Sequence, residues 1–201
     1  QPNNSNSNPN ALQGSLSAIR KMMEDGPSEI PTHHLDALVP LLLHIFRSNN
    51  KTSKIAALQS LVACLASGVV PSALVVQLSD YLQGLSSLAS DPSPQVRKWV
   101  CQSTNTLMEC HTQYIAPQMP SICQFMLQST TLQNNDESVA MEACELWLLV
   151  ATLDESLMTS DMIDTVERLL PQLIPVLLTN VVYSEEQRLE LEVQNEMDME
   201  E

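Results

Sequence analysis

The chain has 201 residues, of which 44% are hydrophobic and 3% aromatic, and its formal net charge is -15. A chain this acidic lacks the basic surface that a nucleic-acid duplex requires, so we expect no nucleic-acid partner. Its four glycines leave little room for phosphate-binding loops or for the tight turn that holds a nucleophilic serine, and neither pattern occurs in the sequence.

Hydrophobic residues recur at steps of three and four along most of the chain, which predicts helices. We expect the Asn-rich segment 1–10 to be disordered and a first helix to run from Ala11 to Gly26. Further helices are expected at His34–Arg47, Lys54–Ala66 and Ala73–Ala89. No alternating pattern of the kind that strands require competes with this interpretation, so the predicted fold class is all-α.

The helical segments repeat at a nearly constant spacing. Ile55, Val96 and Val139 each begin a second helix after a polar turn, at separations of 41 and 43 residues. A period near 40 built from two antiparallel helices is typical of a HEAT-repeat solenoid, an α-α superhelix. At the best-formed turn, we expect Asp91 and Arg97 to form an inter-repeat ladder pair that is largely exposed and orients neighbouring repeats.

The last segment of the chain carries a concentrated negative charge. Residues Glu185 to Glu201 hold eight acidic side chains against a single base. This composition is typical of a solvated, disordered tail, but it is also typical of an acidic segment that binds a partner. Both interpretations stay open.

The cysteines and hydrophobic stretches limit the compartment in which the chain works. Five cysteines form no CxxC pair, and we expect reduced, mostly buried thiols and no metal site. No hydrophobic stretch reaches the roughly 18 to 20 residues that span a bilayer, so no membrane insertion is expected. The first residue is Gln and no signal peptide follows, which we interpret as a piece of a longer chain.

Several longer strings resemble one family of helical-repeat proteins. They include Leu-Ala-Ser-Asp91, Glu142-Ala-Cys-Glu-Leu-Trp147 and Leu170-Pro-Gln-Leu-Ile-Pro-Val-Leu177, in that order and at matching spacing. These strings resemble the transportins, which are importin-β-type nuclear import receptors for cargoes with proline–tyrosine nuclear localisation signals. The resemblance spans about residues 11–185, and segment 153–162 departs from it.

The resemblance implies an organisation and a set of partners. It implies a solenoid fragment of about four repeats at 11–183, followed at 184–201 by the start of a flexible acidic loop that couples Ran binding to cargo release. The implied partners are the GTPase Ran, import cargo proteins and Phe-Gly nucleoporins, and the implied location is the cytoplasm and the nucleus. No cofactor and no catalytic residue are implied.

The candidate partner-binding residues are acidic. Glu142 and Glu145 are expected on one face of a second helix, where they are either part of a surface that meets Ran or ordinary surface acids. The remaining candidates lie in the implied acidic loop: Glu185, Glu186, Glu190, Glu192, Glu196 and Asp198. Trp147 is expected in the core, and Trp99 is expected to be half-exposed between repeats.

Two other functional classes compete with the import receptor. A structural HEAT scaffold, such as a phosphatase regulatory subunit, would share the Asp-Pro-x-x-x-Val-Arg turn but not the acidic insertion. An enzyme with a helical accessory domain would need a nucleophile, acid–base or metal constellation, and none occurs at a workable spacing.

Overall fold

The computed structural model describes residues 9–26, 30–66, 71–132 and 136–181, and all regular secondary structure within these ranges is helical. The elements in chain order are α1 (Pro9–Asp25), α2 (Thr32–Ile45), α3 (Lys51–Ala66), α4 (Ser72–Val76), α5 (Leu78–Leu88), α6 (Pro94–Cys110), α7 (Thr112–Ile115), the 3₁₀ turn η2 (Ala116–Gln118), α8 (Met119–Thr130), α9 (Glu137–Thr152), the 3₁₀ turn η4 (Glu155–Leu157) and α10 (Ser160–Val181).

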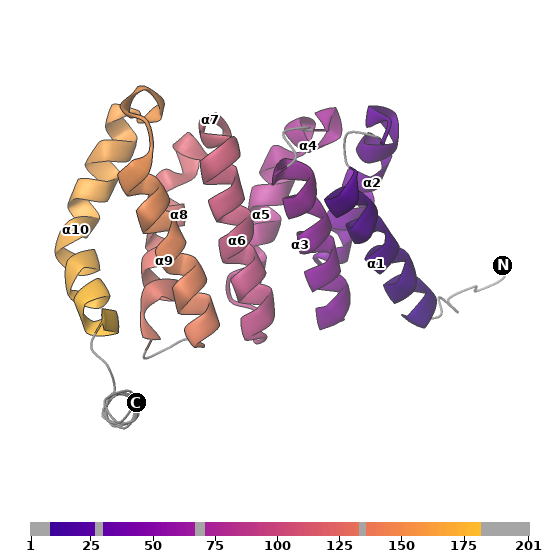
Figure 1. The fold of residues 1–201 in the computed structure, drawn as a ribbon, viewed down its shortest axis with the longest axis horizontal. Coiled ribbons are helices and arrows are strands. Elements are labelled where there is room, and N and C mark those ends of the chain that lie inside the picture. The colour runs from indigo at the N-terminus through magenta and orange to yellow at the C-terminus, as the bar shows by residue number, and fades with distance from the viewer. Residues whose placement is uncertain (1–8, 27–29, 67–70, 133–135, 182–201) are drawn as a thin grey trace, which may run out of the picture.

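The helices form two layers that run the length of the molecule. In one layer α1 packs on α3, α3 on α6 and α6 on α9. In the other layer α2 contacts α4 and α5, and α8 contacts α10. Antiparallel hairpins join the layers through the pairs α2–α3, α5–α6 and α8–α9, and Figure 1 shows the hairpins side by side in a row. This is an all-α HEAT-type solenoid, as the repeat spacing predicts.

Local sequence signals explain why the second helices begin where they do. The Asn50 side chain accepts a hydrogen bond from the N–H of Ser53 at the start of α3, at 3.1 Å. Asp136 caps α9 through the N–H of Ser138 at 3.0 Å. Pro94 occupies the first turn of α6, where a missing N–H costs no helical hydrogen bond.

One continuous core connects the hairpins. Its fully buried side chains come from both layers and from every repeat, so each hairpin hides its apolar face only by packing on its neighbours. A smaller cluster of Met23, Leu35 and Cys64 closes the end of the stack between α1, α2 and α3. The hydrophobic core therefore extends along the row of hairpins and is not concentrated at one centre.

The structure also departs from the predicted boundaries. The predicted helix Ala73–Ala89 divides into α4 and α5 at Gln77, whose backbone leaves the helical region with φ -100° and ψ 20°. The two β-branched residues Val75 and Val76, which are stiff in helices, precede this break. The first helix begins at Pro9, inside the segment 1–10 that we expected to be disordered, and residues 1–8 lie outside the described part of the chain.

Candidate protein-binding surfaces

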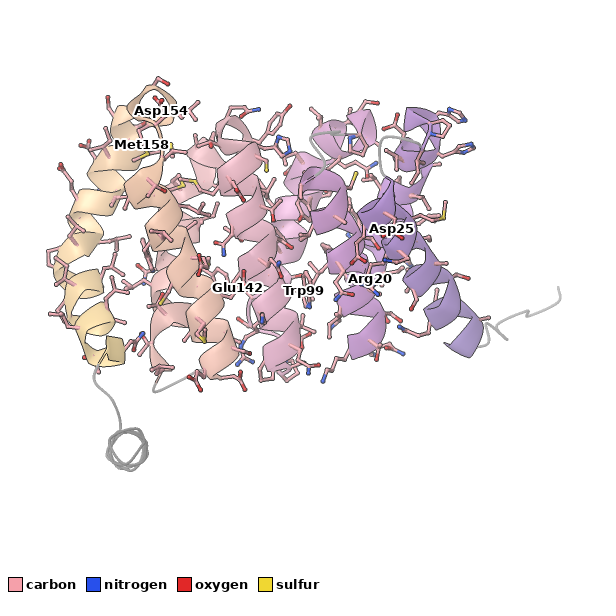
Figure 2. All side chains as sticks on the ribbon, in the orientation of Figure 1. Arg20, Asp25, Trp99, Glu142, Asp154 and Met158 are labelled. Atoms are coloured by element: carbon pink, nitrogen blue, oxygen red, sulfur yellow. The ribbon has the colours of Figure 1, made fainter. Side chains whose placement is uncertain are left out.

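The acidic pair predicted from the sequence lies on α9. Glu142 is half-buried and Glu145 is exposed, because the first faces the neighbouring helix α6 and the second lies nearly one turn further along. In Figure 2, Arg20 on α1, Trp99 on α6 and Glu142 on α9 are spread across the row of second helices. The described part of this layer therefore carries charged and aromatic side chains from three different repeats.

The surroundings of Glu142 favour its neutral form. Burial raises the pKa of Glu142, and the negative charge of Glu145 acts in the same direction. The Asn105 side chain, which donates to Glu142 Oε1 at 3.3 Å, and the positive charge of Lys98 only partly offset this effect. Glu142 is thus a carboxyl at a helix–helix junction, whereas Glu145 is available to a partner in solution.

The inter-repeat contact at Asp91 differs from the predicted ladder. Asp91 Oδ2 accepts a hydrogen bond from Lys54 Nζ of the preceding repeat at 2.7 Å, and the Asp91 side chain is only 7% exposed. Arg97 donates instead to the main-chain oxygen of Asp91 at 2.9 Å. Our expectation of an exposed Asp–Arg pair is therefore wrong. The buried Asp91 carboxylate binds Lys54 of α3, and Arg97 instead binds the main chain of the turn before α6.

Opposing effects act on the Asp91 carboxyl. Burial raises its pKa, but the hydrogen bonds from Lys54 Nζ and from the N–H of Ser93, together with the charges of Lys54 and Arg97, outweigh burial and hold the pKa below its usual range. The carboxylate is therefore charged at neutral pH and ties α3 to the turn before α6.

A groove lies between α5 and α8, in the layer of first helices. Its volume is about 470 Å³, and its apolar lining includes Leu78, Leu82, Ile122 and Phe125. The described residues that line it are uncharged, and hydroxyl and amide groups such as that of Ser86 border the apolar lining. Sequence reasoning missed this groove, because neighbouring hairpins create it and no motif encodes it.

Comparisons with known proteins identify the family to which this stack is related. No family model matches the chain. The chain is 31% identical over 179 residues to transportin of Dictyostelium discoideum, covering 87% of this chain and 18% of that protein. It is 33% identical over 182 residues to transportin-1 of Mus musculus, covering 88% of this chain and 19% of that protein. It is also 33% identical over 180 residues to importin subunit beta-2 of Schizosaccharomyces pombe, covering 86% of this chain and 18% of that protein.

The chain is a homologue of the transportins. It spans about a fifth of the length of the relatives it matches, since the matched segments cover 18–19% of them. The aligned length includes most of the two-layer stack, which agrees with the helical-repeat organisation described above.

The tryptophans of this transportin homologue have different environments. Trp147 is 7% exposed and donates from Nε1 to Thr130 Oγ1 at 2.9 Å, which confirms its predicted place in the core. Trp99 is half-buried and packs against the core from the second-helix layer. A half-buried tryptophan on this layer leaves part of its ring available to a partner.

Three of the five cysteines are buried, in agreement with the prediction that most of the thiols are buried. The cysteines of the described residues form no disulfide. Burial raises the pKa of Cys64 and Cys123 to about 11 and that of Cys101 to about 12. Cys144 is half-buried and Cys110 is exposed, and burial raises the pKa of both. Thiols with raised pKa values are poor nucleophiles at neutral pH.

Other predicted features lie beyond what the structure can place. The acidic candidates Glu185, Glu186, Glu190, Glu192, Glu196 and Asp198 fall in residues 182–201, outside the described residues. Within the described ranges, no group of three or more His, Cys, Asp or Glu side chains is arranged to hold a metal ion. No helix within those ranges combines the length and the hydrophobicity needed to cross a membrane.

Proposed function

We propose that this chain is part of a nuclear import receptor that binds Ran in its GTP form and takes part in carrying cargoes with proline–tyrosine nuclear localisation signals. The observation that carries the proposal is the similarity to transportins over 86–88% of the chain, on a fold with the same helical-repeat character. The proposed role is non-catalytic, and the receptor would shuttle between cytoplasm and nucleus.

The proposed Ran-binding surface is acidic. It comprises Glu145, exposed on α9, with Glu142 beside it. We propose that the acidic segment 185–201 takes part in the same contact with Ran. Such a surface attracts basic patches over distances of about 8 Å at physiological salt and accelerates association more than it fixes affinity. Competition between Ran and cargo for this region would give a reciprocal coupling between the two binding events.

The groove between α5 and α8 supports a second contact, with Phe-Gly nucleoporins. A phenylalanine ring needs an apolar pocket without charge, and the described lining of the groove offers Leu82, Ile122 and Phe125. The hydroxyl and amide side chains at its border would form hydrogen bonds with the backbone of the flanking glycine. The groove lies in the layer of first helices, so it would stay free while a partner occupies the second helices.

The test of the Ran proposal compares binding of Ran-GTP with binding of Ran-GDP, using versions of the chain that end at Glu201 and at Tyr183. We expect retention of the GTP form only, weaker retention by the shorter version, and a further loss in Glu145→Lys because the change reverses a surface charge. Raising the salt concentration should reduce the differences between these versions.

A matched control separates local charge from overall charge. Asp164 is exposed on α10, away from the proposed surface, and Asp164→Lys makes the same change of charge there. This variant should retain Ran-GTP as the unchanged chain does. Equal retention of the GTP and GDP forms by the full chain would reject the import-receptor proposal. Equal retention by the two chain lengths would remove only the acidic segment from the Ran-binding surface.

A further inference from the structure

Asn105 connects two neighbouring second helices through a single side chain. It lies on α6, is 7% exposed, and its Nδ2 donates to the main-chain oxygen of Glu142 on α9 at 2.8 Å. The same nitrogen lies 3.3 Å from Glu142 Oε1. One amide therefore contacts both the backbone and the carboxyl group of one residue on the adjacent repeat.

The other half of this amide has no partner. Asn105 Oδ1 is buried and accepts no hydrogen bond within the described structure. An unpaired buried acceptor is destabilising, because it has lost its hydrogen bonds to water without gaining one in the protein. A carboxylate has no proton to donate to it, whereas a protonated carboxyl can donate one hydrogen bond and accept another.

Few other ionisable groups face this junction. From α6, Lys98 and Cys101 interact electrostatically with Glu142, and from α9 itself Glu145 does. Helix α9 also packs on α8, whose one ionisable side chain is the Cys123 thiol, and contacts α10 through Cys144 and Asn180. No charged residue of α10 is among the groups that shift the pKa of Glu142. The only nearby cation that acts on Glu142 is Lys98, and the pKa of Glu142 remains raised despite it because burial dominates.

We propose that the contact between α6 and α9 responds to protons through Glu142. When Glu142 is protonated, its hydroxyl donates to Asn105 Oδ1 while its carbonyl oxygen accepts from Asn105 Nδ2, so the acid and the amide form a reciprocal pair. When Glu142 is ionised, only the bonds from Nδ2 remain and Oδ1 stays unpaired. Protonation therefore tightens the junction between these two repeats.

The direction of the pH dependence follows from this scheme. Because protonation is favoured in the folded state, the stabilisation is complete below the ordinary pKa of glutamate, about 4.3. It is lost as the pH rises through the higher pKa that Glu142 has in the folded chain. When Glu142 is ionised, the contact between α6 and α9 is therefore less stable than when Glu142 is protonated.

The experiment uses Glu142→Gln in the full chain, because a glutamine amide donates and accepts at every pH as the protonated acid does. At pH 7.5 we expect the Tm of this variant to lie about 2–4 °C above that of the unchanged chain. As the pH falls toward about 4.3 the difference should vanish, since Glu142 itself becomes protonated. Carbon-detected NMR of the labelled carboxyl should show Glu142 titrating above the range of ordinary glutamates.

Two further variants test the mechanism. Glu145→Gln removes the same charge from an exposed position on the same helix and should give no comparable gain. In an Asn105→Ala background, Glu142→Gln should no longer raise the Tm, because the amide that forms the pair is absent. The proposal is overturned if the gain at pH 7.5 persists unchanged at pH 4, if it survives in the Asn105→Ala background, or if Glu142 titrates as an ordinary exposed glutamate does.

Discussion

Gly84 is a residue whose smallness has a specific cause. A Cβ atom at this position on α5 would lie 2.6 Å from Cδ2 of Phe46, whose ring is buried and lies 6.1 Å, centroid to centroid, from that of Tyr81. At Gly14 on α1, by contrast, a Cβ would meet no atom within 4 Å. The two glycines share a helical setting and differ only in what faces them.

We therefore expect Gly84→Ala to lower the free energy of unfolding by about 1–2 kcal/mol, because overpacking against a fixed ring exceeds the gain in helix propensity. Gly14→Ala should raise it by about 0.5–1 kcal/mol, since only the propensity changes. Urea unfolding followed by circular dichroism measures both. A stabilised Gly84→Ala variant would mean that the Phe46 ring moves freely.

The buried ion pair of Lys54 and Asp91 gives a second prediction at this scale. Lys54→Met should destabilise the chain by about 1–3 kcal/mol at pH 7, because Asp91 keeps a buried charge that has lost its strongest hydrogen bond. The lowered pKa of Asp91 means that the native contribution is present above the unfolded pKa of about 3.9 and is lost as the pH falls through the lower folded value.

The difference in stability between Lys54→Met and the unchanged chain should therefore be largest at neutral pH and should become smaller as the pH falls. Lys21→Met breaks an ion pair whose side chains are 64% and 61% exposed, and it should cause no measurable change. Thermal unfolding between pH 3 and pH 8 checks both variants. A loss that is independent of pH would show that Lys54 acts through its packing and not through its charge.

At the scale of the element, α4 depends on a residue from the preceding repeat. This helix has five residues and too few internal hydrogen bonds to be stable alone. Asp36 on α2 accepts the N–H of Ala73 at 2.8 Å and the hydroxyl of Ser72 at 2.7 Å. These bonds, that from Ala73 foremost, lower the pKa of Asp36. A carboxylate from the neighbouring hairpin thus supplies the cap that α4 lacks in its own sequence.

Asp36→Ala should accordingly speed hydrogen exchange in residues 72–76 while leaving α6 protected. Asp154→Ala removes a comparable cap, in which Asp154 Oδ1 accepts a hydrogen bond from the N–H of Ser156 at 2.8 Å, and should leave α4 unchanged. Exchange measured by mass spectrometry distinguishes the two outcomes. Uniformly faster exchange across the whole chain in Asp36→Ala would show that the contact stabilises the stack and not the one helix.

At the scale of the whole molecule, stacking produces surfaces that no single hairpin has. The groove between α5 and α8 opens where two neighbouring first helices are separated while the second helices α3, α6 and α9 remain in continuous contact. Ser86 is exposed and lines the groove, whereas its neighbour Ser87 is exposed and does not line it.

Ser86→Trp should therefore fill the groove and abolish binding of a peptide with Phe-Gly repeats, while the Ser87→Trp control should bind as the unchanged chain does. Fluorescence anisotropy with a labelled peptide measures this, and a Ser-Gly peptide of equal length supplies the baseline. Unaltered binding by Ser86→Trp would place the nucleoporin contact elsewhere on the molecule.

The sequence by itself determined the class of fold and the register of the repeats. Hydrophobic steps of three and four depend only on local helix geometry, so they place α2 and α3 to within a few residues of their observed bounds and the start of α6 near Val96. The core position of Trp147 follows from its apolar neighbours in the same helix. Local patterns of this kind do not depend on how one repeat packs on another.

Only the tertiary structure decided which residues meet between repeats. The choice of Lys54 over Arg97 as the partner of Asp91 and the placement of Asn105 beside Glu142 depend on contacts between residues 37 positions apart. The groove likewise depends on how α5 and α8 of neighbouring hairpins are placed. Repeat spacing brings such residues into the same region but does not fix which side chain reaches which atom. That choice depends on the exact positions of the side chains, which are set when the layers pack.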